Sequence, residues 1–131
     1  MANEINVTFP ANLAVEASVG DFTIRTDQPE KSGGDNSAPS PSALFITSVA
    51  TCAGYFALKF CRARKIDTTG MRLTMQYDWD KELKRYPKMS IQLELPDGFP
   101  EKYRGAIIKA MDQCAVKRSI QQPPEFEMTL I

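Results

Sequence analysis

The stretch that decides the fold is Gly33-Gly34-Asp35-Asn36-Ser37-Ala38-Pro39-Ser40-Pro41-Ser42, which leads directly into the uncharged segment Ala43–Leu58. Gly, Ser, Asn and Pro are typical of loops, so Gln28–Pro41 is predicted to be one. Ser40 is a good helix N-cap and Pro41 suits the first helical position. We therefore expect a long helix to begin here, with Cys52 near its middle.

Strands are predicted before and after this helix in the sequence, because apolar and polar residues alternate in both regions. Three short runs precede it: Glu4–Phe9, Leu13–Val19 and Asp21–Thr26. Gly20-Asp21 is predicted to be the hairpin turn between the last two. Two runs follow it and predict an antiparallel hairpin: Met71–Asp80 and Met89–Leu95.

A second helix is expected from Tyr103 to about Ile120, broken near Cys114, and Phe126–Leu130 is predicted to be a last strand. The order is then β-β-β-α-β-β-α-β. This order indicates an α+β fold, with the helices packed on antiparallel sheet. We expect one domain over residues 1–131, since the length suits a single core.

Composition excludes several classes of protein. The chain has 16 Lys and Arg against 16 Asp and Glu, so no nucleic-acid partner is indicated. Three cysteines favour a reducing, cytoplasmic setting over a disulfide framework. The first residues alternate, so we expect no signal peptide. We also expect no membrane span, because Ala43–Leu58 is shorter than the roughly 20 apolar residues a bilayer needs.

The length of the first helix predicts an assembly. A helix from Pro41 to about Lys65 spans roughly 37 Å at about 1.5 Å per residue. A compact monomer of this size is only about 36 Å across. Because the helix is apolar all round in its first half, it must be covered all round. A two-fold homodimer provides that cover most simply; the alternative is that the second helix alone completes it.

The cysteines are the candidates for chemistry, since the chain contains no histidine. This removes Cys-His dyads and most zinc sites, so we expect neither metal nor cofactor. Cys52 and Cys61 face opposite sides of one helix, which leaves Cys114 as the possible partner of Cys52. Two thiols suggest redox work, although a cysteine in an apolar helix often only packs.

A reactive cysteine needs help to ionise. At a typical pKa near 8.5, only about 3% of a thiol is thiolate at pH 7. Burial raises the pKa further. Without histidine, an Arg or Lys is expected beside Cys52, and the candidates are Lys59, Lys117, Arg118 and Arg25.

The motifs around the two cysteines resemble those of the OsmC/Ohr family, the osmotically inducible and organic hydroperoxide resistance proteins. They are Gly33-Gly34, Pro39–Leu44, Ser48–Cys52 and Cys114–Val116. The resemblance implies two central helices on antiparallel sheet and an intertwined homodimer with active sites at its interface. It also implies a peroxidase for organic hydroperoxides, in which Cys52 attacks, Cys114 resolves and an external dithiol, of lipoyl type in one branch, restores the thiols.

The chain departs from the family pattern at two positions. Ser42 stands where the family holds a glutamate that pairs with an N-terminal arginine, so an Arg–Glu pair is absent or rebuilt, with Arg25 as the available arginine. Ala115 stands where proline is frequent. These departures leave a rival open, a non-enzymatic module whose dimer cleft, lined by Phe45, Tyr55 and Phe56, binds a small apolar ligand with inert cysteines. Transfer of another group, such as sulfur, also remains open.

Overall fold

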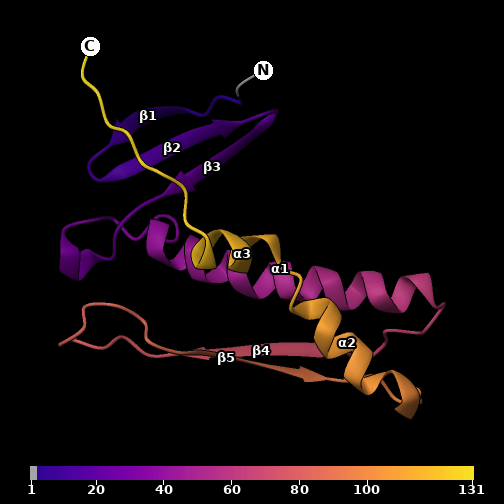
Figure 1. Ribbon diagram of the computed structural model, residues 1–131. Helices are drawn as coiled ribbons and strands as arrows, with labels where there is room; N and C mark the ends of the chain where they lie inside the picture. Colours follow the sequence, from indigo (N-terminus) through magenta and orange to yellow (C-terminus); the bar gives the residue numbers. More distant parts are fainter. Residues whose placement is uncertain (1–2) are drawn as a thin grey trace. The chain divides into compact units, whose positions relative to one another are not determined.

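The computed structural model describes residues 3–131, and the chain divides into two compact units, Met1–Thr47 and Ser48–Ile131. The predicted long helix is α1 (Pro41–Ala63), which begins in the first unit and continues through the second. Each unit has its own antiparallel sheet (Figure 1). The α+β class is confirmed, while the prediction of a single domain stays a prediction.

The first unit contains a three-stranded sheet in the order β1 (Asn6–Ala11), β2 (Ala14–Val19) and β3 (Phe22–Thr26). Val19 pairs with Phe22, which leaves Gly20-Asp21 as the predicted two-residue turn. Gly20 has a φ of 57°, a left-handed conformation that glycine adopts without strain. Most large apolar side chains of this sheet are exposed, among them Val7, Phe9, Val19, Phe22 and Ile24.

The Gly- and Ser-rich loop is folded tightly around Asp27, which is only 1% exposed. Its carboxylate accepts hydrogen bonds from Ser37 Oγ at 2.5 Å, from the Gln28 amide at 2.7 Å and from the Ser37 amide at 3.0 Å. These bonds lower the pKa of Asp27 to about 2, with the Ser37 hydroxyl as the main cause. Gly34 passes so close to Gln28 that a Cβ there would lie 2.1 Å from the Gln28 carbonyl oxygen.

Helix α1 begins as predicted, because the Ala43 amide donates to Ser40 Oγ at 3.2 Å. It ends at Ala63 rather than at Lys65, since Lys65 adopts a left-handed φ of 55° and the Ile66 amide bonds back to the Cys61 carbonyl. One stripe of the helix is buried, at spacings of three and four residues: Ile46, Val49, Ala53, Ala57 and Phe60. Three large apolar residues outside this stripe are exposed: Phe45, Tyr55 and Leu58.

Helix α1 is long and apolar enough to cross a membrane, with 23 residues and a mean hydropathy of 1.5 over its most apolar window. The apolar helix is therefore longer than Ala43–Leu58, and its length does not exclude a membrane span. A third of that window (33%) is buried within the chain. The core helix of a soluble protein meets the same criteria of length and composition.

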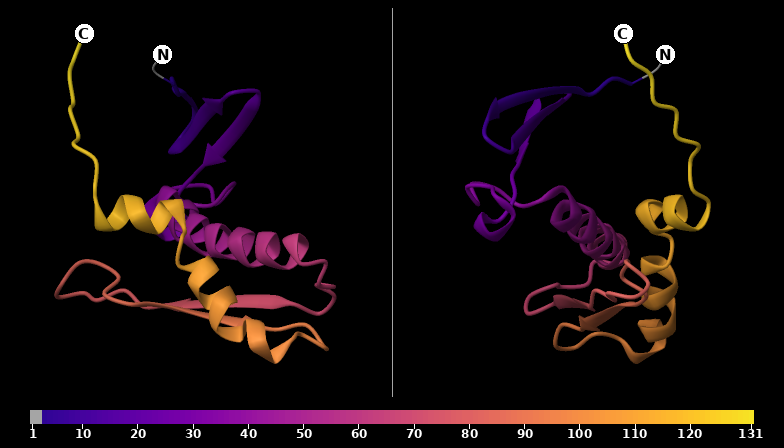
Figure 2. Two further views of the ribbon diagram at one scale, coloured as in Figure 1. Left: turned by 45° about the vertical axis from the view of Figure 1, so that its right-hand side comes forward. Right: turned by 90° about the vertical axis from the view of Figure 1, so that its left-hand side faces the viewer.

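The second unit places α1 on a two-stranded sheet formed by β4 (Arg72–Tyr77) and β5 (Met89–Glu94). Ala57, Phe60 and Cys61 form a buried cluster with Ile107 of α2 (Arg104–Met111), and Leu93 of β5 packs against it. The predicted break near Cys114 is confirmed, because α3 (Ala115–Gln121) follows α2 in a new direction (Figure 2).

The predicted last strand is wrong. Residues 123–131 are extended, but they pair with no strand of the described chain (Figure 2). Phe126, Met128 and Leu130 do alternate, yet all three side chains are exposed. Alternation supplies only the apolar face of a strand. A strand also needs a neighbouring edge for its N–H and C=O groups.

We predict opposite effects for two glycine substitutions. Gly34→Ala should destabilise the protein by about 1–3 kcal/mol, because the new Cβ overlaps the Gln28 carbonyl. Gly105→Ala, inside α2 and with open space around its Cβ, should stabilise the protein by about 0.5–1 kcal/mol. Urea midpoints of the two variants and the parent check this; equal midpoints for all three would contradict the loop geometry.

Candidate functional site

The structure brings Cys52 and Cys114 together. Cys52 lies near the middle of α1 and is half-buried, while Cys114 precedes α3 and is 3% exposed. Their side chains are hydrogen-bonded to each other, and both thiols are free. Cys61 is fully buried in the cluster around Ile107, on another face of the same helix. The predicted pairing of Cys52 with Cys114 rather than Cys61 therefore agrees with this geometry.

Cys114 owes its position to the break between α2 and α3. Its φ of −53° and ψ of 122° are not helical, and its Sγ accepts a hydrogen bond from the Lys117 amide at 3.4 Å. Cys114 is thus the N-cap of α3, a position that Ser, Thr, Asp and Asn usually fill. Because cysteine is not a usual cap, the sequence pointed to a break near Cys114 but not to this role.

The pKa of the Cys52 thiol is lowered. Burial works against this, but hydrogen bonds from the Cys114 side chain and from the Val116 and Ala115 amides outweigh it. Donors that bond to a thiolate favour the charged form. The sequence argument required an Arg or Lys beside Cys52, whereas the groups that lower its pKa here are a thiol and two backbone amides. That argument overlooked the amides that a chain break exposes.

The pKa of the Cys114 thiol is raised. Burial is the main cause, and the hydrogen bond to Cys52 and the negative charge of the Cys52 thiolate add to it. The amides of Lys117 and Val116 oppose the shift without reversing it. Of the two thiols, Cys52 therefore ionises more readily than Cys114.

The other predicted site residues have different surroundings. Lys59 and Arg118 are exposed, and neither contributes to the pKa of Cys52. In the first unit, Ser42 is exposed in the first turn of α1. Arg25 lies opposite Glu16 in the sheet, forms an ion pair with it at 3.6 Å and donates from Nε to Ser37 Oγ at 3.1 Å. An Arg–Glu pair is thus present, with Glu16 as the acid.

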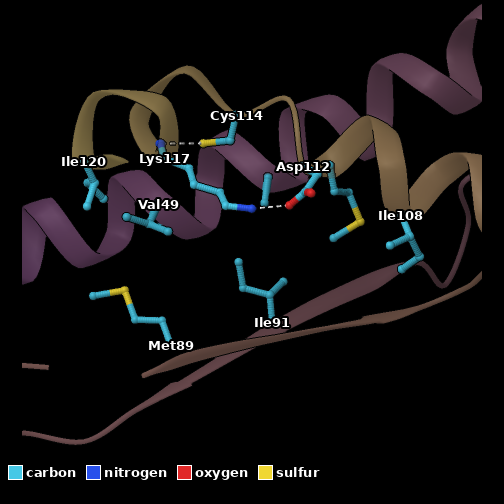
Figure 3. A pocket seen from close by; sticks show the side chains of 10 residues that line it. Val49, Met89, Ile91, Ile108, Asp112, Cys114, Lys117 and Ile120 are labelled. Atoms are coloured by element: carbon cyan, nitrogen blue, oxygen red, sulfur yellow. Dashed lines mark hydrogen bonds and ion pairs between the residues drawn. The ribbon is translucent and has the colours of Figure 1, made fainter. Parts of the chain in front are cut away.

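A cavity of about 350 Å³ lies beside Cys114 (Figure 3). Its walls are mainly apolar side chains of α1, β5, α2 and α3: Val49, Ala53, Met89, Ile91, Ile108, Met111 and Ile120. Its polar residues are Cys114 and the ion pair between Lys117 Nζ and Asp112 Oδ1. Phe45, Tyr55 and Phe56 do not border this cavity, and the predicted dimer cleft between them stays a prediction.

Sequence reasoning missed Asp112 and the cavity. The Asp112–Lys117 pair is five residues apart and spans two helices, so it has no helical spacing that a pattern could reveal. The cavity draws on four elements that are distant in the chain. Among residues 3–131, no group of three or more His, Cys, Asp or Glu side chains is placed to hold a metal ion.

A family model described as OsmC-like protein matches residues 34–129, which contain both cysteines and the break between α2 and α3. The chain belongs to the OsmC-like family. Comparison with curated proteins finds no match.

Solved structures share the OsmC-like fold. One is a candidate osmotic stress induced and detoxification response protein from Psychrobacter arcticus, with a TM-score of 0.76 and 22% identity over 91% of this chain and 88% of that one. Another is an organic hydroperoxide resistance protein from Legionella pneumophila, with a TM-score of 0.60 and 18% identity over 92% and 90%. A third, from Elizabethkingia anophelis and also an organic hydroperoxide resistance protein, has a TM-score of 0.59 and 19% identity over 91% and 88%.

We predict that Cys114→Ala raises the pKa of Cys52, because the variant removes a hydrogen bond that lowers it. The rate of Cys52 alkylation by iodoacetamide, followed by peptide mass spectrometry, should then rise with pH at higher values than in the parent. Cys61→Ala is the matched control and should leave the profile in place, since Cys61 does not contact Cys52. Identical profiles for the parent and Cys114→Ala would show that the hydrogen bond has no influence.

Proposed function

We propose that this chain is a thiol-dependent peroxidase that reduces organic hydroperoxides, with Cys52 as nucleophile and Cys114 as resolving cysteine. The observation that carries the proposal is the hydrogen-bonded pair itself, in which the more exposed sulfur is the one with the lowered pKa. Membership of the OsmC-like family supports a role in peroxide stress.

The chemistry begins at Cys52. Its thiolate attacks the terminal oxygen of the hydroperoxide, the O–O bond breaks, and the alkoxide leaves and takes up a proton to become an alcohol. Cys52 becomes a sulfenic acid, oxidised by two electrons. A half-buried position suits this step, because the sulfur must be reached by substrate.

The second step uses Cys114. Once Cys52 is a neutral sulfenic acid, the thiolate charge that raised the pKa of Cys114 is gone. Cys114 then ionises more readily, attacks the sulfenic sulfur and releases the hydroxyl group as water, which leaves a Cys52–Cys114 disulfide. A dithiol reductant, which the family resemblance suggests is of lipoyl type, then restores both thiols.

We predict that cumene hydroperoxide is consumed in the presence of a dithiol and that Cys52→Ser lowers the rate to the uncatalysed background. When the dithiol is left out and hydroperoxide is in excess, Cys114→Ser should undergo the first oxidation and then accumulate sulfinic acid, since no resolving thiol is left to trap the sulfenic acid. Cys61→Ser is the control and should retain the parent rate. Peroxide loss can be followed by a ferrous–xylenol assay. Equal rates for the parent and Cys52→Ser would rule out the proposed mechanism.

A homodimer is part of the proposal, with a cytoplasmic location. The sheet of the first unit exposes Phe9 and Phe22 to 80% and 76%, and the part of α1 in the second unit exposes Tyr55 to 55%. Apolar side chains of one sheet face and one helix face are normally covered in a stable domain. A second copy is the cover that the helix length also predicts.

We predict a dimer of about twice the 14.6 kDa chain mass in detergent-free buffer, measured by analytical ultracentrifugation. Tyr55→Glu should weaken the dimer, because it places a charge where apolar surface is expected to be buried. Lys59→Glu, one turn further along α1, is the control. A monomer, or a protein that partitions into the membrane fraction, would contradict this assembly.

A binding module without catalysis remains the second candidate, and the apolar cavity beside Cys114 favours it. Its size lies within the range of small-ligand pockets, about 300–1,000 Å³. Native mass spectrometry separates the two functions. A retained apolar ligand, with no disulfide after mild oxidation, would support the module.

A further inference from the structure

The cavity borders only one of the two paired cysteines. Cys114 borders it, whereas Cys52 is not among the described residues that form its walls (Figure 3). The two cysteines therefore face different surroundings. Cys52 is half-buried, and Cys114, only 3% exposed, borders the cavity. A molecule held in the cavity would meet Cys114 first.

We propose that this cavity admits the dithiol that re-reduces the oxidised protein, and that the incoming thiolate attacks Cys114 Sγ rather than Cys52 Sγ. The inference rests on the proposed function, because it concerns the Cys52–Cys114 disulfide that the function creates. It assigns the two substrates to different sulfurs: the hydroperoxide meets Cys52, and the reductant meets Cys114.

The exchange proceeds in two steps. A thiolate of the dithiol attacks Cys114 Sγ, the Cys52–Cys114 bond breaks, and Cys52 leaves as a thiolate. The second thiol of the reductant, after losing its proton, attacks its own sulfur in the mixed disulfide. The reductant closes into a cyclic disulfide, and Cys114 leaves and takes up a proton. The two electrons from the dithiol end on the two cysteines.

The choice of sulfur follows from the leaving groups. In thiol–disulfide exchange, the thiol with the lower pKa leaves faster. The Val116 and Ala115 amides, which lower the pKa of Cys52, belong to the backbone and are available to receive its departing charge. Cys114 would be the poorer leaving group, since burial raises its pKa. Attack at Cys114 thus expels the better-stabilised thiolate.

The cavity walls define the class of reductant. Val49, Ile91 and Ile108 offer apolar contacts to an aliphatic chain. The charged part of the wall is the ion pair between Lys117 and Asp112, which leaves no net charge there. An aliphatic dithiol matches these walls better than a highly charged thiol such as glutathione.

The first test identifies the attacked sulfur. Protein oxidised with diamide, which makes the disulfide without peroxide, is mixed with excess 1-butanethiol and quenched with acid. Peptide mass spectrometry then locates the mixed disulfide. We expect butanethiol on Cys114; its presence on Cys52 would overturn the proposal. Because diamide replaces the peroxide, the result does not depend on peroxidase activity, and a protein that reduces peroxides but carries butanethiol on Cys52 would lose only this inference.

The second test blocks the cavity. Ile108 and Ile120 border it and are 60% and 47% exposed, so tryptophan fits there without overpacking the core. We expect Ile108→Trp and Ile120→Trp to slow reduction of the diamide-oxidised protein by dihydrolipoamide about tenfold, the scale on which apolar pockets discriminate small changes in shape. Lys109→Trp, on the same helix but outside the cavity, is the control for Ile108→Trp. If both cavity variants are reduced as fast as Lys109→Trp, the dithiol enters elsewhere.

Discussion

The site depends on the hydrogen bonds that converge on Cys52. A thiol on an apolar helix would ordinarily stay protonated, because burial penalises the thiolate. Here hydrogen bonds from the Cys114 side chain and from the Val116 and Ala115 amides outweigh burial and lower the pKa of Cys52. The amides are available only because the chain breaks between α2 and α3, since the first amides of a helix have no intrahelical acceptor. The break that makes Cys114 an N-cap therefore also creates the electrostatics of Cys52.

The same arrangement makes the two sulfurs unequal. Cys52 is more exposed and has a lowered pKa, while Cys114 is buried, has a raised pKa and borders the apolar cavity. Because each cysteine alters the protonation of the other, oxidation of Cys52 changes the reactivity of Cys114 without a structural switch. Such a pair can carry out successive steps with different partners. Asp112 and Lys117, paired across the α2–α3 junction, lie where both the break and the cavity are formed.

Several errors of the sequence reading share one cause, which is that a periodic pattern does not specify what covers or pairs with an element. Phe126, Met128 and Leu130 alternate like a strand, but a strand forms only beside a free edge. The start of α1 was predicted correctly from Ser40 and Pro41, because a helix cap depends only on nearby residues. What covers its exposed side chains is a question of assembly. The cation expected beside Cys52 was an inference from side chains alone and left out the backbone donors.

The sequence by itself determined the α+β class, the start of α1, the hairpin turn at Gly20-Asp21, the break near Cys114 and the family, because these rest on local capping, turn chemistry and motif residues. Only the tertiary structure decided that the Cys52 and Cys114 side chains are hydrogen-bonded and that two backbone amides lower the pKa of Cys52. It also decided that the cavity borders Cys114 and not Cys52. These features join α1, α2, α3 and β5, which are distant in the chain. Their distances are fixed by packing, and no spacing in the sequence encodes them.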